Sequence, residues 1–353
     1  MSQSLSHIIE FRCLSRASMS QLDQPSMGGQ YHPMSWSVLV TRRIPIEGID
    51  RLRRRGVDLS LHDEEVQLSR SELLKRLRSC DGALITGGDR VDAEFLDAAP
   101  KLKAISVIAV GYDNVDLAEV TRRRIPVTNT PDVLNDACAD LTWALILGVA
   151  RRIPEGNQLS HSGTWRGWAP TQLRGVDVAG KTLGIVGAGR IGTAVAKRAT
   201  GFSMRILYVA RQAKPEMEAL GAKRMTFDEV LRESDFLCVH VPLTPETRQM
   251  FGEAQFRKMK PTAIFINMAR GPVHDEAALV RALREGWIAG AGLDVYEHEP
   301  KISPELLQTP NTLLLPHLGS ATIETRRRMS IMAAENLLSL LEGRPCPNIV
   351  NPF

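Results

Sequence analysis

The chain has 353 residues, of which 43% are hydrophobic, and its 44 basic and 40 acidic residues leave a formal net charge of +4. At roughly 150 residues per domain this length predicts about two domains, and the nearly balanced, scattered charge argues against a nucleic-acid-binding protein. No apolar run approaches the roughly 18 residues of a membrane-spanning helix, so no membrane association is expected.

Residues 1–34 differ in composition from the rest of the chain. They are rich in Ser, Gln and Met and show no sustained hydrophobic period. Arg12 and Arg16 among several serines faintly suggest a transit peptide, but Glu10 and the lack of an arginine-rich face argue against it. We therefore expect a disordered extension, or an upstream start with Met34 as the working one.

The five cysteines are odd in number, and no pair has metal-ligand spacing. Cys238 lies in an apolar run, which is typical of a small core residue. This usage suits a reducing compartment, so a cytoplasmic location is expected.

The first part of the chain alternates short apolar runs with helical spacing. A strand and its exit loop are predicted at 35–45, and helical spacing follows at 46–55. Further short strands are predicted at 82–87, 102–111 and 125–131. This alternation predicts a parallel sheet surrounded by helices.

A long helical run at 137–152 comes next, followed by a predicted loop that carries Trp165 and Trp168. The αβ alternation restarts at Lys181. The strands predicted beyond it are 182–186, 205–209, 236–241, 263–267, 289–294 and 312–315. One more long helix is predicted at 320–342. The pattern thus predicts two α/β units, about 35–138 and about 181–317. The last segment could return to the first unit, and two long helices would then cross the boundary.

A glycine-rich loop follows the first strand of the second unit and opens a helix. It reads Gly187-Ala188-Gly189-Arg190-Ile191-Gly192. In this strand–loop–helix context the glycines permit a tight turn, the approach of a pyrophosphate and close helix packing. The free N–H groups at the helix start would then face the anion.

Three further segments place polar residues at the carboxyl ends of predicted strands, where ligands bind in open α/β sheets. The first delivers Arg270, the second Asp294, Glu297 and Glu299, and the third His317. Each residue alone has an ordinary explanation as a surface or loop residue. Together, an arginine, a carboxylate and a histidine beside a dinucleotide suit the reduction of a 2-oxo acid.

In that chemistry the arginine binds the substrate carboxylate and polarises the carbonyl by charge-assisted hydrogen bonds. The histidine donates the proton, and the glutamate favours its imidazolium form. No metal is needed.

The chain resembles the D-isomer-specific 2-hydroxyacid dehydrogenases, and within them the glyoxylate/hydroxypyruvate reductase branch. The resemblance covers about Val38 to Pro352 and rests on specific motifs. These are SVIAVGYDNVDL, VTNTPDVLNDACADLTWALIL, GKTLGIVGAGRIG, VHVPLTPETR, FINMARGPVHDEAAL, GLDVYEHEP and LPHLGSAT.

The resemblance implies an α/β fold of two Rossmann-like domains with parallel sheets. A dinucleotide-binding domain of residues 139–317 would be inserted into a flavodoxin-like substrate domain of residues 35–138 and 318–353. It also implies a homodimer that acts on a small 2-oxo acid such as glyoxylate or hydroxypyruvate.

The family motifs carry site residues onto this chain. The catalytic set falls on Arg270, Glu299 and His317. The glutamate of the family motif adjoins a proline, so it is Glu299 rather than the nearby Glu297. The backbone of Val110 and Gly111, together with Arg270, would bind the substrate carboxylate. The expected cofactor-binding residues are Gly187, Gly189, Arg190, Ile191, Gly192, Ala210, Arg211, His240, Val241, Pro242, Thr247 and Asp294. Many relatives have glycine where this chain has Asp132.

The cofactor preference is predicted from Ala210 and Arg211, which stand where many dinucleotide sites carry an acidic residue for the ribose hydroxyls. The absence of that acid removes its repulsion of a 2′-phosphate, and Arg211 supplies a cation that fits one; Lys214 adds charge nearby. NADPH is therefore the expected cofactor, with NADH possible.

Three alternatives stay open from the sequence. A dinucleotide sensor or corepressor can share this scaffold without catalysis. A sugar-derived keto acid such as 2-ketogluconate could be the substrate, because the sequence does not fix the pocket size. A phosphoglycerate dehydrogenase is less expected, because no room is left before Phe353 for an added regulatory domain.

Overall fold

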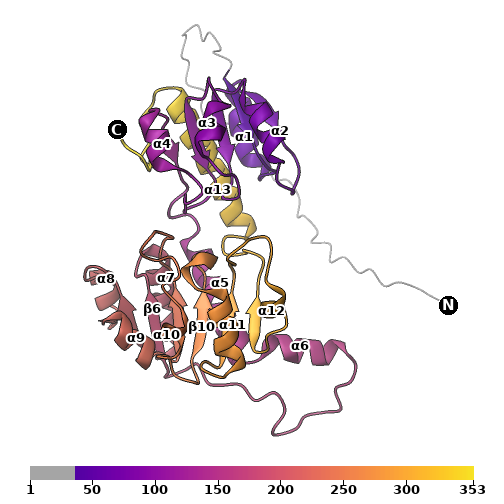
Figure 1. Cartoon of the computed structure of the whole chain (residues 1–353), viewed down its shortest axis with the longest axis vertical. Helices are drawn as coiled ribbons and strands as arrows, with labels where there is room; N and C mark the ends of the chain where they lie inside the picture. The colour runs from indigo at the N-terminus through magenta and orange to yellow at the C-terminus, as the bar shows by residue number, and fades with distance from the viewer. Residues whose placement is uncertain (1–35) are drawn as a thin grey trace, which may run out of the picture. The chain divides into compact units, whose positions relative to one another are not determined.

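The structure, a computed structural model, describes residues 36–353. The extension predicted for residues 1–34 lies outside these described residues. The described residues form two β-sheets, each made of parallel strands with helices packed on it (Figure 1). No helix among these residues is long and apolar enough to cross a membrane.

The first sheet has five parallel strands in the order β2-β1-β3-β4-β5, the flavodoxin-like order. Its strands are β1 (Ser37–Val40), β2 (Asp58–Leu61), β3 (Gly82–Ile85), β4 (Ala104–Val107) and β5 (Val127–Thr128). The connecting helices are α1 (Ile46–Arg54), α2 (Arg70–Leu77), α3 (Ala93–Asp97) and α4 (Leu117–Arg122). The strands β1, β3 and β4 are nearly continuous apolar runs because both faces of a parallel sheet are covered by helices.

The C-terminal part of the chain returns to this first sheet. The helix α13 (Ile323–Leu341), yellow in Figure 1, packs against α1, β3 and β4. A Cβ atom on Gly48 of α1 would lie 2.6 Å from the carbonyl oxygen of Ser330, so glycine permits this close helix contact. Beyond α13, Val350 N–H donates to Val127 O over 2.9 Å, and Asn351 Oδ1 accepts from Val127 N–H over 2.8 Å. The last residues therefore clasp the edge strand β5.

The second sheet has seven parallel strands in the order β12-β11-β10-β9-β6-β7-β8. Its strands are β6 (Thr182–Val186), β7 (Arg205–Val209), β8 (Lys223–Arg224), β9 (Phe236–Val239), β10 (Ile264–Asn267), β11 (Gly290–Leu293) and β12 (Thr312–Leu314). The α-helices between α4 and α13 are α5 (Asn135–Ala150), α6 (Ile153–His161), α7 (Arg190–Ala199), α8 (Pro215–Glu218), α9 (Phe227–Glu233), α10 (Glu253–Phe256), α11 (Glu276–Arg284) and α12 (Pro304–Leu307). Two 3₁₀ turns are η1 (Thr200–Phe202) and η2 (Gly271–Val273). The strand order reverses between β6 and β9, which is the ligand-binding crevice of a Rossmann sheet.

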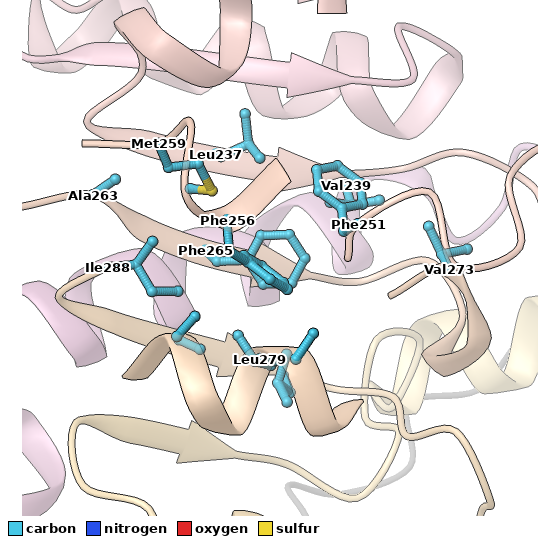
Figure 2. Packing of buried hydrophobic residues seen from close by; sticks show 14 of the residues in the cluster. Leu237, Val239, Phe251, Phe256, Met259, Ala263, Phe265, Val273, Leu279 and Ile288 are labelled. Carbon is cyan, nitrogen blue, oxygen red and sulfur yellow. The ribbon is translucent and has the colours of Figure 1, made fainter. Parts of the chain in front are cut away.

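A cluster of phenylalanines fills one face of the second sheet (Figure 2). The rings of Phe251 and Phe265 meet edge-to-face with centroids 5.1 Å apart, and Phe256 meets Phe265 at 5.2 Å. Leu279 of α11 packs into the same cluster. This core fixes β10, whose carboxyl end carries Arg270.

Several predicted strands are longer than the observed ones, and two of them are much longer. The run 102–111 forms a strand only at β4, and the run 125–131 forms only the two-residue β5. The residues beyond each strand leave the ladder and build loops at the carboxyl edge of the sheet. The loop predicted directly after residue 152 is wrong in its first part, because α6 occupies 153–161. Pro154 lies in the first turn of α6, where its fixed φ favours helix initiation.

Candidate active site

The glycine-rich loop lies at the switch point of the second sheet, between the end of β6 and the start of α7. Gly187 has φ +103°, and a Cβ there would lie 2.6 Å from the carbonyl carbon of His240. A Cβ on Gly192 would overlap the carbonyl oxygen of Gly187, whereas one on Gly189 would meet no atom within 4 Å. Two glycines are thus needed for packing within the protein, and the space at Gly189 is left open for a ligand.

The N-terminus of α7 faces this open space without a side-chain cap, because its N-cap residue is Gly189. Uncapped N–H groups and the positive end of the helix dipole suit a pyrophosphate. Nearby, both ring nitrogens of His240 lack a hydrogen-bond partner among the described residues. Burial lowers the pKa of His240 to about 4, so the ring is neutral at neutral pH. These features fit a bound dinucleotide.

Arg190, the first residue of α7, pairs with Asp132 over 2.8 Å between Nε and Oδ1. Asp132 has φ +69°, in the left-handed region that Asp tolerates better than most residues. The loop therefore keeps a conformation that glycine would favour, and the aspartate side chain reaches the phosphate loop.

Ala210 and Arg211 follow β7, the neighbour of β6 on the side away from β9, and the Arg211 side chain is exposed. The guanidinium of Arg224 in β8 binds this loop. Its Nε donates to Ala210 O over 3.0 Å, and its Nη2 donates to Arg211 O over 2.7 Å. Arg224 thus adds a second cation beside Arg211, and no motif in the sequence pointed to it.

Thr247, expected at the cofactor, already uses its hydroxyl within the turn after β9. The hydroxyl donates to Pro242 O over 2.6 Å and accepts from Thr244 N–H over 2.8 Å. It thereby fixes the shape of the His240–Pro242 segment, which lies against the glycine-rich loop.

Arg270 follows β10 in a turn that Asn267 holds. The Asn267 amide donates to Arg270 O over 3.0 Å, and its oxygen accepts from Ala269 N–H over 2.9 Å. The Arg270 guanidinium reaches the loop after β4, where a Cβ on Gly111 would overlap Nη2. Glycine at 111 therefore allows the arginine to lie directly against the backbone there.

His317 and Glu299 form a hydrogen-bonded pair, with 2.8 Å between Nδ1 and Oε2. Burial acts to raise the pKa of Glu299, but the hydrogen bond and charge of His317, with a smaller contribution from Arg270, lower it below its ordinary value. The Glu299 carboxylate is therefore ionised at neutral pH. Among the hydrogen bonds of residues 36–353, none joins Glu297 to His317, and Glu297 Oε1 instead accepts from Gln249 Nε2 over 3.5 Å.

Asp294 holds the backbone next to the histidine. It is almost fully buried, and its two carboxylate oxygens accept from Leu318 N–H over 2.6 Å and from Gly319 N–H over 2.8 Å. Burial raises the pKa of Asp294. His317 itself has φ +56°, a conformation that costs a side chain roughly 1 kcal/mol or more. The Asp294 carboxylate stabilises this strained turn, in addition to any contact with a cofactor.

Close backbone packing brings the loops after β10 and β11 together. A Cβ on Gly271 would overlap the carbonyl group of Tyr296, and the Tyr296 hydroxyl donates to Leu315 O over 2.9 Å in the loop before His317. Arg270, Glu299 and His317 are therefore carried by three loops in contact, at the carboxyl ends of neighbouring strands.

The family model for the NAD binding domain of D-isomer specific 2-hydroxyacid dehydrogenases matches residues 143–319. A glyoxylate reductase of Thermococcus onnurineus is 49% identical over 323 residues, covering 90% of this chain and 96% of the relative. This chain belongs to the D-isomer-specific 2-hydroxyacid dehydrogenases. A glyoxylate reductase of Thermococcus kodakarensis is 50% identical to this dehydrogenase over 319 residues, covering 89% of the chain and 96% of the relative.

Solved structures share the fold of the dehydrogenase. A crystal structure of a Thermus thermophilus protein superimposes with a TM-score of 0.84 at 48% identity, covering 89% of this chain and 99% of that one. An NADPH-dependent glyoxylate/hydroxypyruvate reductase from Sinorhizobium meliloti, in complex with NADP and malonate, superimposes with a TM-score of 0.79 at 34% identity. It covers 89% of this chain and 96% of that one. The predicted α/β fold and the predicted family are both confirmed.

Proposed function

We propose that this dehydrogenase reduces glyoxylate and hydroxypyruvate to their 2-hydroxy acids, in the D configuration where a stereocentre forms. Its relatives named glyoxylate reductase and the glyoxylate/hydroxypyruvate reductase of similar structure support this substrate class. The observation that carries the proposal is the joint placement of Arg270 against Gly111 and of His317 on Glu299.

The substrate carboxylate is bound by the loop after β4 and by Arg270. The backbone N–H groups of Val110 and Gly111 have no hydrogen-bond partner among the described residues, and the Arg270 Nη2 lies beside them. Two backbone donors and a guanidinium edge match the oxygens of a 2-oxo acid. The arginine also polarises the oxo group and thereby stabilises the negative charge that develops on its oxygen.

The proton comes from His317. Its Nδ1 is held by Glu299, and its Nε2 has no partner in the described part of the chain. Nε2–H is therefore free to donate to the substrate oxygen while the ionised carboxylate stabilises the imidazolium. The glycine-rich loop and the N-terminus of α7 would hold a nicotinamide dinucleotide, which would supply the hydride. His317 regains its proton from solvent after the hydroxy acid leaves.

The two sheets are assigned separate tasks in this proposal. Residues 139–317 bind the dinucleotide, which the matched NAD-binding region 143–319 and the glycine-rich loop support. Residues 35–138 and 318–353 bind the 2-oxo acid, which the open N–H groups after β4 support.

A substrate panel tests the proposed function. Purified protein is mixed with NADPH and with glyoxylate, hydroxypyruvate, 2-ketogluconate or phosphohydroxypyruvate, and the loss of NADPH absorbance is followed. We expect the highest kcat/KM with glyoxylate or hydroxypyruvate. A higher value with 2-ketogluconate would reassign the substrate, and NADPH binding without turnover of any acid would indicate a dinucleotide sensor.

A preference for NADPH over NADH is the finer part of the proposal. Ala210 leaves space where an acid would repel a 2′-phosphate, and Arg211 is exposed beside the Arg224 guanidinium. Replacing Arg211 by Ala should remove one charge-assisted contact and lower the NADPH-to-NADH ratio of kcat/KM by about 10–150-fold. Ala210→Asp should lower the same ratio by repulsion.

The matched control for this test is Arg205→Ala at the opposite end of β7, where Arg205 pairs with Glu233. The NADPH-to-NADH ratio of kcat/KM should stay at the wild-type value in that variant. Equal use of the two cofactors by the wild type would contradict the proposed preference.

We also propose a cytoplasmic homodimer, as the family resemblance implies. Trp165 and Trp168 are 57% and 82% exposed in the single chain, which is unusual for large apolar side chains and favours a partner surface. Light scattering on a size-exclusion column should give twice the 39.0 kDa chain mass. A monomeric mass over the working concentration range would contradict the dimer.

A further inference from the structure

We propose that Asp113 is a positioning residue for Arg270, an inference that rests on the proposed function. The two side chains come from loops after β4 and β10, on different sheets. The Arg270 Nε donates to Asp113 Oδ1 over 2.9 Å, and both side chains are about 30% exposed, at 27% and 31%. The aspartate orients the guanidinium so that its remaining donors face the substrate.

The hydrogen-bond inventory of Arg270 shows which donors remain. A guanidinium has five N–H bonds in a fixed plane. Asp113 takes the one on Nε, and the carbonyl of Ala269 takes one on Nη1 over 2.8 Å. Three are left, and two of them are on Nη2, beside Gly111. The plane of the arginine is therefore fixed at two points, and its free edge lies where the substrate carboxylate is expected.

Asp113 is itself held in position by neighbouring residues. Asn114, next to Asp113, donates through Nδ2 to Thr86 O over 3.2 Å and to Asp89 O over 2.7 Å. Asp89 is fully buried and accepts from the Thr41 hydroxyl over 2.6 Å. The turn that carries Asp113 is thus tied to the ends of β1 and β3, so its carboxylate occupies a defined position.

The charge of Asp113 has a second effect of opposite sign. A carboxylate close to the substrate site repels a bound carboxylate, which raises KM. Fixing the guanidinium lowers KM and raises kcat, because a preoriented group loses less freedom in the transition state. We infer that orientation dominates, since the ion pair to Arg270 neutralises much of the aspartate charge.

Two variants separate these effects. Asp113→Ala removes the acceptor and the charge, whereas Asp113→Asn removes the charge and keeps an acceptor for Nε. Asp113→Ala should raise KM for glyoxylate by at least about tenfold, because a hydrogen bond to a charged group contributes about that much to binding. It should also lower kcat. Asp113→Asn should restore most of that loss. KM for NADPH should change in neither variant.

The control is Asp63→Ala, because Asp63 accepts from Arg43 Nε over the same 2.9 Å at an exposed site. Its melting temperature shows the structural effect of losing such a pair, and its KM for glyoxylate should equal the wild-type value. A KM that is unchanged or lowered in Asp113→Ala would overturn the proposal. An equal loss in Asp113→Ala and Asp113→Asn would also overturn it.

Arg270→Lys and the unreactive analogue oxamate distinguish this failure from that of the proposed function. If Arg270→Lys loses most of its kcat/KM for glyoxylate while Asp113→Ala keeps the wild-type value, only the positioning role of Asp113 is overturned. Wild-type kinetics in Arg270→Lys would overturn both. If the wild type reduces no acid but binds oxamate with cofactor present, the function fails, and weaker oxamate binding by Asp113→Ala still supports the orientation of Arg270.

Discussion

Glu299 is one of two glutamates two residues apart, and only the fold gives it a different environment from Glu297. Its Oε1 accepts from Tyr296 N–H over 3.0 Å, which directs Oε2 toward His317. These two hydrogen bonds explain why Glu299, and not Glu297, binds the histidine.

His317→Asn is expected to keep cofactor binding and to lower kcat by about 10²–10⁴-fold, the usual weight of a general acid. Cofactor affinity is measured by fluorescence titration and kcat by NADPH loss. An unchanged kcat would remove His317 from the mechanism.

Glu299→Gln should move the pH profile of reduction. The Glu299 pKa is lowered, so its charge is present at neutral and alkaline pH, where it stabilises the imidazolium. Without that charge, the rate should fall on the alkaline side first, at a lower pH than in the wild type. Glu297→Gln is the matched control and should keep the wild-type profile.

The sequence could identify Arg270, Glu299 and His317 as candidates because each stands in a recognisable motif after a predicted strand. It could not identify Arg224 or Asp113. Arg224 lies in the two-residue strand β8, and its partners are two backbone carbonyls 13 and 14 residues earlier. Asp113 meets Arg270 only because two separate sheets contribute to one site.

At the scale of elements, the turn from β6 into α7 contains glycines with different reasons for being small. Gly192→Ala should reduce the melting temperature strongly, because the Cβ would overlap the Gly187 carbonyl within the protein. Gly189→Ala should leave the melting temperature near the wild-type value and weaken NADPH binding, because its Cβ enters open space at the helix N-terminus. Thermal unfolding and fluorescence titration of both variants check this. Equal effects of the two substitutions on binding and on melting would contradict the assignment.

The turn after β10 contains His274, which is fully buried with Nδ1 2.9 Å from the Asn267 amide nitrogen. Burial lowers its pKa to about 4 from 6.5, against the weaker opposing charges of Glu276 and Asp275. The unfolded chain then binds more protons than the folded one between these two values. The contribution of neutral His274 is therefore complete above pH 6.5 and is lost as the pH falls toward 4.

The predicted consequence is that the stability difference between the wild type and His274→Gln narrows on acidification through that window. The expected slope is roughly 1 kcal/mol per pH unit. Urea unfolding at a series of pH values measures it. For His161→Gln, at an exposed position of α6, the free energy of unfolding should differ from that of the wild type by the same amount at every pH. A pH-independent difference for His274→Gln would contradict the prediction.

Elements with a strong apolar pattern were predictable, including the short strands β6 and β7, whereas half-buried or exposed elements were not. The helices α5 and α13 match the predicted runs to within three residues at each end, because their apolar periods extend over several turns. The strand β2 and the helix α6 have half-buried or exposed residues, so they lack a strong hydrophobic period. Their place in the fold depends on pairing and on Pro154, rather than on an apolar pattern.

At the scale of the molecule, the βα alternation predicted parallel sheets but not the order of their strands. The reversal between β6 and β9 depends on which side each crossover helix packs, and the local sequence does not state this. The apolar pattern left open whether the C-terminal segment returns to the first sheet, and the family resemblance implied that it does. In the structure, α13 packs on this sheet and Asn351 bonds to β5.

Asn351 links the end of the chain to β5 and to the segment before it. It accepts from Val127 N–H and donates to Ile125 O over 3.0 Å, and it is almost fully buried. Asn351→Ala should cost about 2–3 kcal/mol in the free energy of unfolding, because two buried backbone groups lose their partner. Urea unfolding checks this, with Asn157→Ala at an exposed site as the control. A variant as stable as the wild type would show that the clasp contributes little.

The return of α13 to the first sheet also sets an order of events during synthesis. Every strand of the seven-stranded sheet has left the ribosome once Leu314 has emerged, so that sheet can be completed on the nascent chain. The five-stranded sheet begins earlier but waits for Met329, Ala333 and Leu337 of α13 to cover Val38 and Leu84. The sheet whose strands are made first is therefore completed last, and its apolar face stays uncovered until α13 has been synthesised.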